Sequence, residues 1–294
     1  MEYAQKDDLD MINTLASKLF PMAEVLSTAR QGGMTNHTYE VKLTVGDYIF
    51  RLPGPGTENM INRYHEEISA KLAGELGIDT ELFYFNAETG VKIVRYIKNA
   101  ETMSPVTMRK SENVQAAAEL FKKLHTCGRD TGVPFDVFAM AEGYENLIRK
   151  YQVEFYPDYV QIRRRVMDIK DKIEQKAAKK VPCHNDPLCE NWVRGEGRIF
   201  LVDWEYAGMN DPMWDLSDLS IEAEYSRQLD DELLKAYLGR NVSEEEHFRF
   251  QANKIFVDFL WSLWGKARVP FGGTEMEQYA WMRYNRMKQN LSKI

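Results

Sequence analysis

Cysteine is scarce in this sequence, and the few cysteines form no disulfide pattern. The 294 residues include only Cys127, Cys183 and Cys189. An odd, sparse set excludes a disulfide-stabilised scaffold and favours a reducing compartment. The spacing of Cys183, His184 and Cys189 also matches no zinc-binding pattern. We therefore expect neither disulfides nor a zinc site, and we expect His184 to have a structural role.

Long apolar runs and an excess of positive charge are lacking as well. No stretch approaches the roughly 18 uninterrupted apolar residues of a membrane span, and the N-terminus lacks the pattern of a signal peptide. The net charge of -7 leaves no basic surface for a nucleic-acid backbone. The one dense basic run, 163–165, falls on the polar face of a helical pattern. We expect a cytoplasmic protein without a nucleic-acid partner or membrane insertion.

Internal repeats and low-complexity linkers are also absent, and the hydrophobic pattern changes once along the chain. Residues 39–45 alternate as a strand with Val45 among the inward positions, Gly46-Asp47 predicts the turn, and 48–52 returns as the paired strand. The next predicted elements are a helix over 61–76 and strands over 82–85 and 91–97. After about residue 98 helical periodicity prevails, interrupted by one polar loop and one short apolar strand.

These elements predict an α+β fold with two lobes. The smaller lobe, residues 1–97, would hold an antiparallel sheet and one helix and bind a nucleotide. The larger lobe, residues 98–294, would be mostly helical and carry the catalytic and acceptor-binding residues. Such a layout is typical of kinases.

The polar loop contains the residue types that phosphoryl transfer requires. Asp186 and Asn191 are five residues apart, and Asp203 ends the apolar strand at 199–202. A kinase needs a carboxylate to orient the acceptor hydroxyl, an asparagine to bind Mg²⁺, and a second carboxylate to hold the metal on the phosphates. Asp186, Asn191 and Asp203 fit these three roles in that order.

The segments around these residues resemble a known family. HNDPLCEN at 184–191 and LVDWEYAGMNDPMWDL at 201–216 are similar to the choline/ethanolamine kinases, and most similar to the bacterial choline kinases that supply phosphocholine for cell-surface decoration. The likeness covers most of the chain. It implies a protein-kinase-like fold of the aminoglycoside-phosphotransferase type, ATP and Mg²⁺ as cofactors, Asp186 as catalytic base, and Asn191 and Asp203 as magnesium ligands.

The nucleotide side of the site is expected in the first third of the chain. Arg51 lies on the strand where protein kinases place a lysine, and its forked guanidinium can bind phosphate oxygens. GGMTNHTYEV at 32–41 resembles the nucleotide-binding hairpin of the family. The expected nucleotide-binding residues are Arg51, Glu66, Gly32, Gly33, Arg95, Tyr96 and Ile97.

The acceptor side is expected to be aromatic. All six tryptophans fall between 192 and 281, and FLWSLW at 259–264 resembles the choline-site helix of the family. Aromatic faces near acids suit a quaternary ammonium, which has no N–H to donate. The expected acceptor-binding residues are Glu205, Tyr206, Glu222, Trp261, Trp264 and Tyr279.

The short segment after Asp203 favours a small-molecule substrate. Trp204-Glu205 follows Asp203 directly, and only seven residues separate Asp203 from Asp211. This distance leaves little room for a phosphorylatable activation segment. The preferred function is phosphorylation of choline. Ethanolamine, another amino alcohol or an aminoglycoside are alternative acceptors, and a non-catalytic binding module on a kinase scaffold is a further alternative. The oligomeric state and the choice between ATP and GTP stay open.

Overall fold

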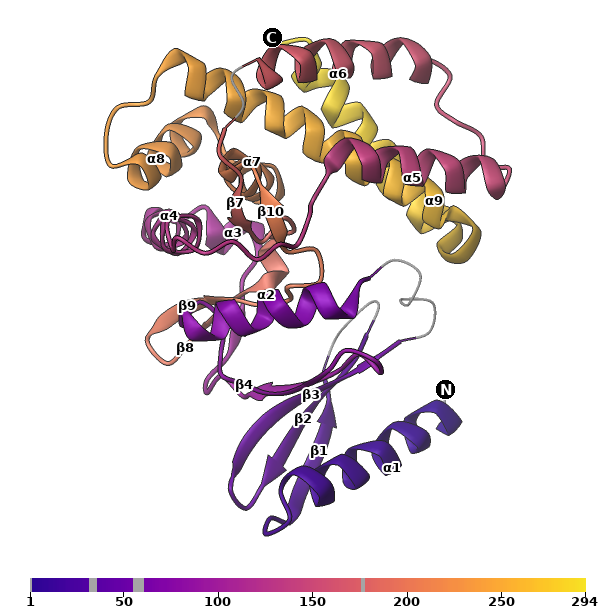
Figure 1. Cartoon of the computed structure of the whole chain (residues 1–294), viewed down its shortest axis with the longest axis vertical. Helices are drawn as coiled ribbons and strands as arrows, with labels where there is room; N and C mark the ends of the chain where they lie inside the picture. Colours follow the sequence, from indigo (N-terminus) through magenta and orange to yellow (C-terminus); the bar gives the residue numbers. More distant parts are fainter. Residues whose placement is uncertain (1, 32–35, 55–60, 176–177) are drawn as a thin grey trace. The chain divides into compact units, whose positions relative to one another are not determined.

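A computed structural model of the chain describes residues 2–31, 36–54, 61–175 and 178–294 (Figure 1). The predicted phosphate-binding glycines, Gly32 and Gly33, lie outside these described ranges.

The chain divides into two compact units. One is made of Met1–Thr102 and Asn191–Tyr206, and the other of Met103–Glu190 and Ala207–Ile294. The predicted boundary between residues 97 and 98 differs from this division, because the segment that holds Asn191 and Asp203 belongs with the N-terminal residues.

The first unit is built on a five-stranded antiparallel sheet of order β1-β2-β3-β5-β4. Its strands are β1 (Val25–Arg30), β2 (Asn36–Leu43), β3 (Gly46–Pro53), β4 (Leu82–Asn86) and β5 (Val91–Arg95). The helices α1 (Glu2–Leu19) and α2 (Arg63–Glu75) complete the N-terminal part, and a smaller sheet joins β6 (Glu101–Thr102) to β8 (Trp192–Gly195) and β9 (Arg198–Leu201).

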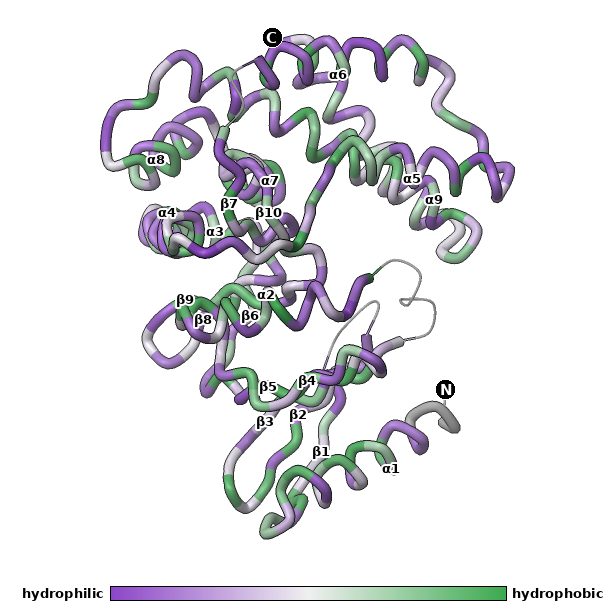
Figure 2. The backbone as a smooth tube through the Cα atoms, viewed as in Figure 1, coloured by the Kyte–Doolittle hydropathy of each residue, from purple (hydrophilic) through white to green (hydrophobic). Residues whose placement is uncertain are grey.

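The helix α1 covers one face of the main sheet because it carries an apolar stripe. Ile12, Ala16 and Phe20, four residues apart, are buried with Tyr39 and Phe50 of the sheet. Figure 2 shows hydrophobic segments along α1 and along the strands of the sheet. The spacing of four residues places them on one side of a helix.

The predicted turn at Gly46-Asp47 is wrong by two residues. In the β2–β3 hairpin Leu43 pairs with Gly46, so the two turn residues are Thr44 and Val45. Val45, predicted to point inward, is 56% exposed. Gly46, with φ of +142°, supplies a backbone conformation that residues with a side chain rarely adopt, and it begins the return strand.

The β8–β9 hairpin packs against the end of β5 and the turn after α2. Leu201 N donates to Ile78 O, and Arg198 Nη1 donates to Gly77 O. A Cβ atom on Gly195 would collide with Ile97, so only glycine allows this approach. These contacts attach the chain segment that ends in Asp203 to the sheet of the first unit.

The second unit is mostly helical. Its elements are α3 (Pro105–Met108), α4 (Ser111–His125), α5 (Val137–Lys150), α6 (Tyr159–Glu174), β7 (Val181–Cys183), β10 (Gly208–Asn210), α7 (Pro212–Glu222), α8 (Arg227–Leu238) and α9 (Glu244–Leu291), and a short 3-10 helix, η1 (Cys189–Asn191), leads into the first unit. The strands β7 and β10 pair antiparallel. The sheet-bearing and helical units confirm the predicted fold class.

The long helix α9 is broken at Gly273, whose φ of 56° and ψ of -137° are not helical. The segment after the break packs back on the segment before it, since the ring of Tyr279 lies 5.7 Å from that of Trp264. Among the helices that the structure describes, none is both long enough and apolar enough to cross a membrane.

Candidate active site

An ion network in the first unit surrounds the predicted magnesium ligand Asp203. Arg51 Nη1 of β3 lies 2.6 Å from Glu66 Oε1 of α2 and 3.5 Å from Asp203 Oδ1. Arg51 and Glu66, two of the expected nucleotide-binding residues, therefore form an ion pair. Burial opposes ionisation of Glu66, but the charges and hydrogen bonds of Arg51 and Arg63 outweigh it and hold its pKa below the ordinary value. Glu66 is therefore ionised and fixes Arg51 beside Asp203.

A second arginine, which the sequence did not single out as a site residue, joins the same network. Arg63 Nη1 donates to Glu66 Oε2 and to Glu205 Oε2, both at 2.7 Å. Asn36 Nδ2 donates to Glu205 Oε1 at 3.0 Å. Both oxygens of Glu205, a predicted acceptor ligand, are therefore bonded within the first unit. Burial and the neighbouring charge of Asp203 raise the pKa of Glu205 to about 7.

Asp203 is held in an unusual backbone conformation. Its φ is +68°, a region that non-glycine residues rarely occupy and that is often found at functional sites. Burial raises the pKa of Asp203, while Arg51, Lys92 and Arg63 act to lower it. Because 40% of the side chain is exposed, water weakens the effect of burial. The carboxylate is accessible and flanked by cations.

Arg51 keeps unused hydrogen-bonding capacity. Its Nε and Nη2 are buried and have no hydrogen-bond partner in the part of the chain that the structure describes. A buried guanidinium N–H without an acceptor is costly. Two free donors of one planar fork match two oxygens of a phosphate, so Arg51 is suited to hold an anionic ligand.

The expected nucleotide-binding residues Arg95, Tyr96 and Ile97 are divided between two environments. Ile97 is buried under the β8–β9 hairpin. Arg95 and Tyr96 line an open cavity of about 400 Å³ at the end of α2. Its walls mix both charges, including Lys71, Glu75, Glu81, Glu196 and Arg198.

The loop that carries Asp186 is fixed in the second unit by Asp215 of α7. Asp215 accepts hydrogen bonds from the backbone N–H groups of His184 at 2.8 Å and Asn185 at 2.7 Å. Asn185 has a φ of +68°, which asparagine tolerates better than most residues. Asp186 itself stays half-buried. Asp215 therefore orients the loop through its backbone and leaves the side chain of Asp186 in place for another role.

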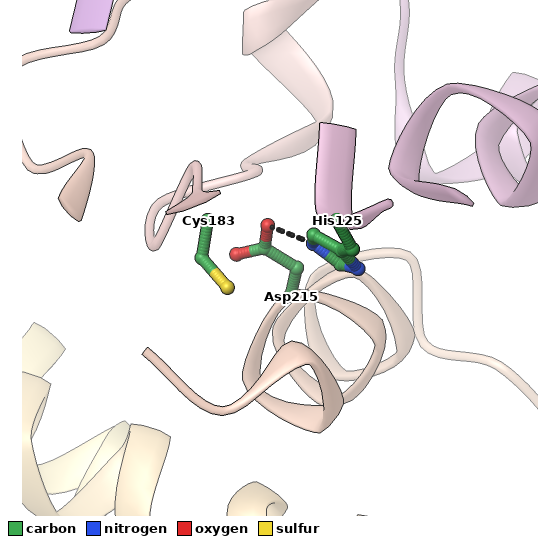
Figure 3. A group of neighbouring side chains, drawn as sticks. All are labelled: His125, Cys183 and Asp215. Atoms are coloured by element: carbon green, nitrogen blue, oxygen red, sulfur yellow. Dashed lines mark hydrogen bonds and ion pairs between the residues drawn. The ribbon is translucent and has the colours of Figure 1, made fainter. Parts of the chain in front are cut away.

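Asp215 is in turn held by a buried group (Figure 3). His125 Nε2 lies 3.0 Å from Asp215 Oδ2, and His125 Nδ1 lies 3.0 Å from the hydroxyl of Tyr237. Cys183 Sγ is near enough to form a metal-type cluster with His125 and Asp215. Burial raises the pKa of the Cys183 thiol, and the nitrogen and oxygen atoms already have partners. The hydrogen bonds of Asp215 and His125 in this cluster support the loop.

The aromatic residues predicted for the acceptor meet around the break in α9. The rings of Trp261 and Trp264 lie 6.2 Å apart, and Tyr279 follows at 5.7 Å from Trp264, both pairs edge to face. Trp261 is buried, whereas Trp264 and Tyr279 are half-buried. Tyr206, the other predicted aromatic ligand, belongs to the first unit.

Arginines that the sequence did not single out surround Glu222. Arg283 Nη1 lies 2.6 Å from Glu222 Oε1, and Arg286 Nη2 lies 3.3 Å from it. Arg283 Nε also donates to the hydroxyl of Tyr279 at 3.0 Å. Tyr279 and Arg283 are four residues apart on one helix, a spacing that brings side chains together and could have revealed this pair. Glu222 is thus connected to Tyr279 through Arg283.

Comparison with known proteins identifies the family. The choline/ethanolamine kinase family model matches residues 28–237. The protein LicA of Haemophilus influenzae is 26% identical over 82% of this chain and 73% of its own. A choline/ethanolamine kinase family protein from Mesorhizobium loti superposes with a TM-score of 0.85 at 32% identity, covering 96% of this chain and 94% of that one.

Two solved structures bear on the ligand and the fold. The choline kinase LicA from Streptococcus pneumoniae gives a TM-score of 0.81 at 31% identity over 96% of this chain and 99% of that one, and a LicA structure holds AMP. An aminoglycoside 2'-phosphotransferase, 14% identical, has a TM-score of 0.68 over 96% and 98% of the chains, so the aminoglycoside-phosphotransferase-like fold is shared. The chain therefore belongs to the choline/ethanolamine kinase family and is an enzyme that transfers phosphate from a nucleotide to a small alcohol.

Proposed function

We propose that this kinase uses Mg²⁺ and ATP to phosphorylate the hydroxyl of choline, giving phosphocholine and ADP. The observation that carries the proposal is the cluster of aromatic rings formed by Trp261, Trp264 and Tyr279 in the same unit as Asp186. This unit thus holds both a carboxylate that can take a proton and rings that can bind a quaternary ammonium. The two ends of choline, hydroxyl and trimethylammonium, need these two groups.

The first unit supplies the residues for the phosphate donor. Arg51 would bind phosphate oxygens through Nε and Nη2, its two donors without a described partner. Asp203 and Asn191 would hold Mg²⁺, which prefers oxygen ligands and when bound neutralises charge on the phosphate oxygens. The carboxylate of Asp203 is 40% exposed, and its neighbour Val202 donates its N–H to Asn191 O at 2.9 Å, so the segments that carry the two oxygen ligands are bonded to each other. Glu205, with both oxygens occupied, would position Arg63 rather than contact the acceptor.

The second unit supplies the base. As the choline oxygen attacks the γ-phosphorus, its proton passes to Asp186, a P–O bond to choline forms, and the bond from the γ-phosphorus to the bridging oxygen breaks to release ADP. Asp215 keeps Asp186 in place through the backbone of His184 and Asn185. The barrier is lowered mainly by positioning and charge neutralisation.

The aromatic cluster favours choline over ethanolamine. Methyl groups of a quaternary ammonium carry spread positive charge that packs on ring faces, each contact being worth about 0.5 to 2 kcal/mol. The primary ammonium of ethanolamine would bring N–H donors to rings that cannot fully accept them, at a cost of about 1 to 3 kcal/mol. We expect kcat/KM for choline to exceed that for ethanolamine by about ten- to several-hundred-fold.

An ADP-release assay tests the proposal with choline, ethanolamine, thiamine and an aminoglycoside as acceptors. Wild-type enzyme should prefer choline, and Trp264→Ala should lose most of the preference while Trp264→Phe keeps part of it. Asp186→Ala should lose at least about a thousandfold in turnover with ATP binding retained. Equal kcat/KM for choline and ethanolamine in the wild type would refute the choice of acceptor.

A further inference from the structure

Tyr144 lies at the middle of α5. Two ring contacts, one on each side of it, show which part of α9 it faces. Phe138 lies edge to face with Phe256 at 5.2 Å, and Tyr151 lies likewise with Phe271 at 5.5 Å. The two contacts are thirteen residues apart on α5 and fifteen on α9, so the helices run side by side in the same direction (Figure 1). Tyr144, six residues after Phe138, therefore lies level with the α9 segment that carries Trp261 and Trp264.

The electrostatic neighbours of Tyr144 agree with this position. Burial raises its pKa first, and the charges of Asp186 and Tyr279 raise it further. The pKa of Tyr279 is also raised by burial, with Glu222 and Asp186 adding to the rise against Arg283. Tyr144, Tyr279 and Asp186, contributed by α5, α9 and the loop after β7, thus lie within electrostatic range of one another.

The hydroxyl of Tyr144 distinguishes it from the other buried tyrosines of the second unit. Tyr156 donates to Ser262 O and Ala280 O, Tyr159 to Glu145, and Tyr284 to Asp158. Buried tyrosine hydroxyls usually have such a partner. Tyr144 is only 8% exposed, and the structure gives its hydroxyl no hydrogen bond within the described ranges. The hydroxyl oxygen of Tyr144 is not one of the buried side-chain atoms without a partner in the described ranges, so it reaches accessible space where a ligand can bond it.

From these observations we infer that Tyr144 contacts the acceptor, its ring packing on the ammonium methyl groups and its hydroxyl bonding the acceptor oxygen beside Asp186. The inference rests on the proposed function, because it assumes a cationic alcohol at the aromatic cluster. It adds a residue from α5 to the aromatic residues of α9. Tyr144 would then help to set both the affinity for a quaternary ammonium and the placement of the reacting hydroxyl.

Two substitutions separate the ring from the hydroxyl. Tyr144→Leu removes the ring and should raise the KM for choline at least about tenfold, with the KM for ATP unchanged and the preference for choline over ethanolamine reduced. Tyr144→Phe keeps the ring and should keep the KM for choline within about threefold while kcat falls about three- to tenfold. Tyr151→Leu, which removes a ring from the same pair of helices next to Phe271, should leave both KM values unchanged.

The outcomes distinguish this inference from the proposed function. If the wild type turns over choline but folded Tyr144→Leu keeps its KM within twofold, the inference is wrong and the proposed function stands. If Tyr144→Leu does not fold, Tyr144→Phe decides, and wild-type kcat and KM in that variant would overturn the inference. If the wild type phosphorylates none of the cationic alcohols, both fail.

Discussion

At the scale of single residues, Asp218 lies in surroundings that disfavour a charged carboxylate. It lies on α7 between Asp215, whose oxygens accept backbone hydrogen bonds, and Glu222, which pairs with arginines. Both oxygens of Asp218 are buried and have no donor among the described residues. Burial above all, together with the charge of Glu222, raises its pKa well above the ordinary value. The folded protein therefore keeps this carboxyl protonated at pH values where the unfolded chain ionises it.

Replacing Asp218 by Asn should stabilise the protein at neutral and alkaline pH. A raised folded-state pKa means that stability is lost as pH rises above the unfolded value, near 3.9, because the unfolded chain then releases a proton that the folded chain retains. We expect Asp218→Asn to exceed the wild type by at least about 1 kcal/mol at pH 8, or roughly 2 to 4 °C, and the difference to shrink toward pH 4. Urea unfolding at several pH values measures it, with the exposed Asp168→Asn as control. A wild type more stable than Asp218→Asn at pH 8 would contradict this.

The network around Arg51 leads to a prediction about ATP. Arg51→Ala leaves Glu66 buried with one arginine instead of two, and it removes the proposed phosphate ligand. We expect the KM for ATP to rise at least about tenfold and the KM for choline to stay unchanged, whereas Arg51→Lys should retain partial activity because only the forked geometry is lost. Steady-state kinetics measures both. Arg240→Ala, which removes an exposed arginine paired with Glu246, is the control, and unchanged ATP kinetics in Arg51→Ala would place the phosphate anchor elsewhere.

Residue types and spacing predict the chemistry of a site better than its partners. Asp186, Asn191 and Asp203 could be singled out because phosphoryl transfer needs these groups in a fixed order, and the assignment of their roles stays a proposal. The hydrogen bonds of Glu205 could not be predicted, because their donors, Asn36 and Arg63, are more than 140 positions away from Glu205 in the sequence. The proposed contact of Tyr144 with the acceptor could not be predicted either, since it depends on which face of α5 packs against α9.

At the scale of elements, the fold of α9 onto itself depends on Gly265. A Cβ atom there would lie 2.8 Å from the Tyr279 ring and 3.2 Å from Ala280 Cα. Real Cβ atoms do not approach backbone or ring atoms so closely, and the two segments of α9 can pack at this point only because glycine has no side chain. Gly265 thereby allows Tyr279 to reach Trp264.

Gly265→Ala should therefore displace Tyr279. Overpacking of this kind costs about 1 to 3 kcal/mol, and we expect the KM for choline to rise several-fold while the KM for ATP stays unchanged. Gly143→Ala is a matched control, because Gly143 is an exposed glycine of the helix α5 with no atom within 4 Å of an added Cβ. That control should gain about 0.4 to 1 kcal/mol. Thermal unfolding and kinetics of both variants test the idea, and an unchanged KM for choline in Gly265→Ala would argue against it.

Elements were predictable where periodicity was strong, and less so at their ends. The helix predicted over 61–76 from its apolar spacing and from Gly77 corresponds to α2, where Gly77 has a positive φ. At the other end Asn62 caps the helix by accepting from the N–H groups of Tyr64 and His65. The hairpin turn was misplaced because Val45 continues the alternation of the strand by chance. A periodic pattern cannot reveal that the chain has already turned.

At the scale of the whole molecule, the chain passes between its two units three times. Residues 191–206, which hold Asn191, Asp203 and Glu205, return to the first unit after almost ninety residues of the second. Local patterns change near residue 98, and this change suggested the single boundary between 97 and 98. The return depends on long-range contacts such as the pairing of β6 with β8, which the sequence pattern does not reveal.

Because the first unit is made of two separate chain segments, we can predict which fragment of it folds alone. Residues 1–102 alone would leave Ile97, Ile78 O and Gly77 O without the β8–β9 hairpin that covers or bonds them. Because Thr102 pairs with Val193, a short Gly-Ser linker can join residue 102 to residue 191. We expect 1–102 joined to 191–206 to unfold cooperatively on heating and 1–102 alone to lack a cooperative transition, since strand pairing and apolar burial are both lost.

Nucleotide binding by the joined fragment tests the proposed donor residues apart from the acceptor. It contains Arg51, Glu66, Asn191 and Asp203, so it should bind Mg²⁺-ATP in a calorimetric titration, and Asp203→Ala should weaken that binding because a carboxylate neutralises metal charge. The matched control is Glu88→Ala, which changes an exposed acid in the turn between β4 and β5, outside the ion network and the cavity lined by Arg95 and Tyr96. A cooperative transition of equal midpoint for 1–102 alone would show that residues 191–206 are dispensable for this unit. Equal Mg²⁺-ATP affinity in the Asp203→Ala and Glu88→Ala fragments would remove Asp203 from the metal site.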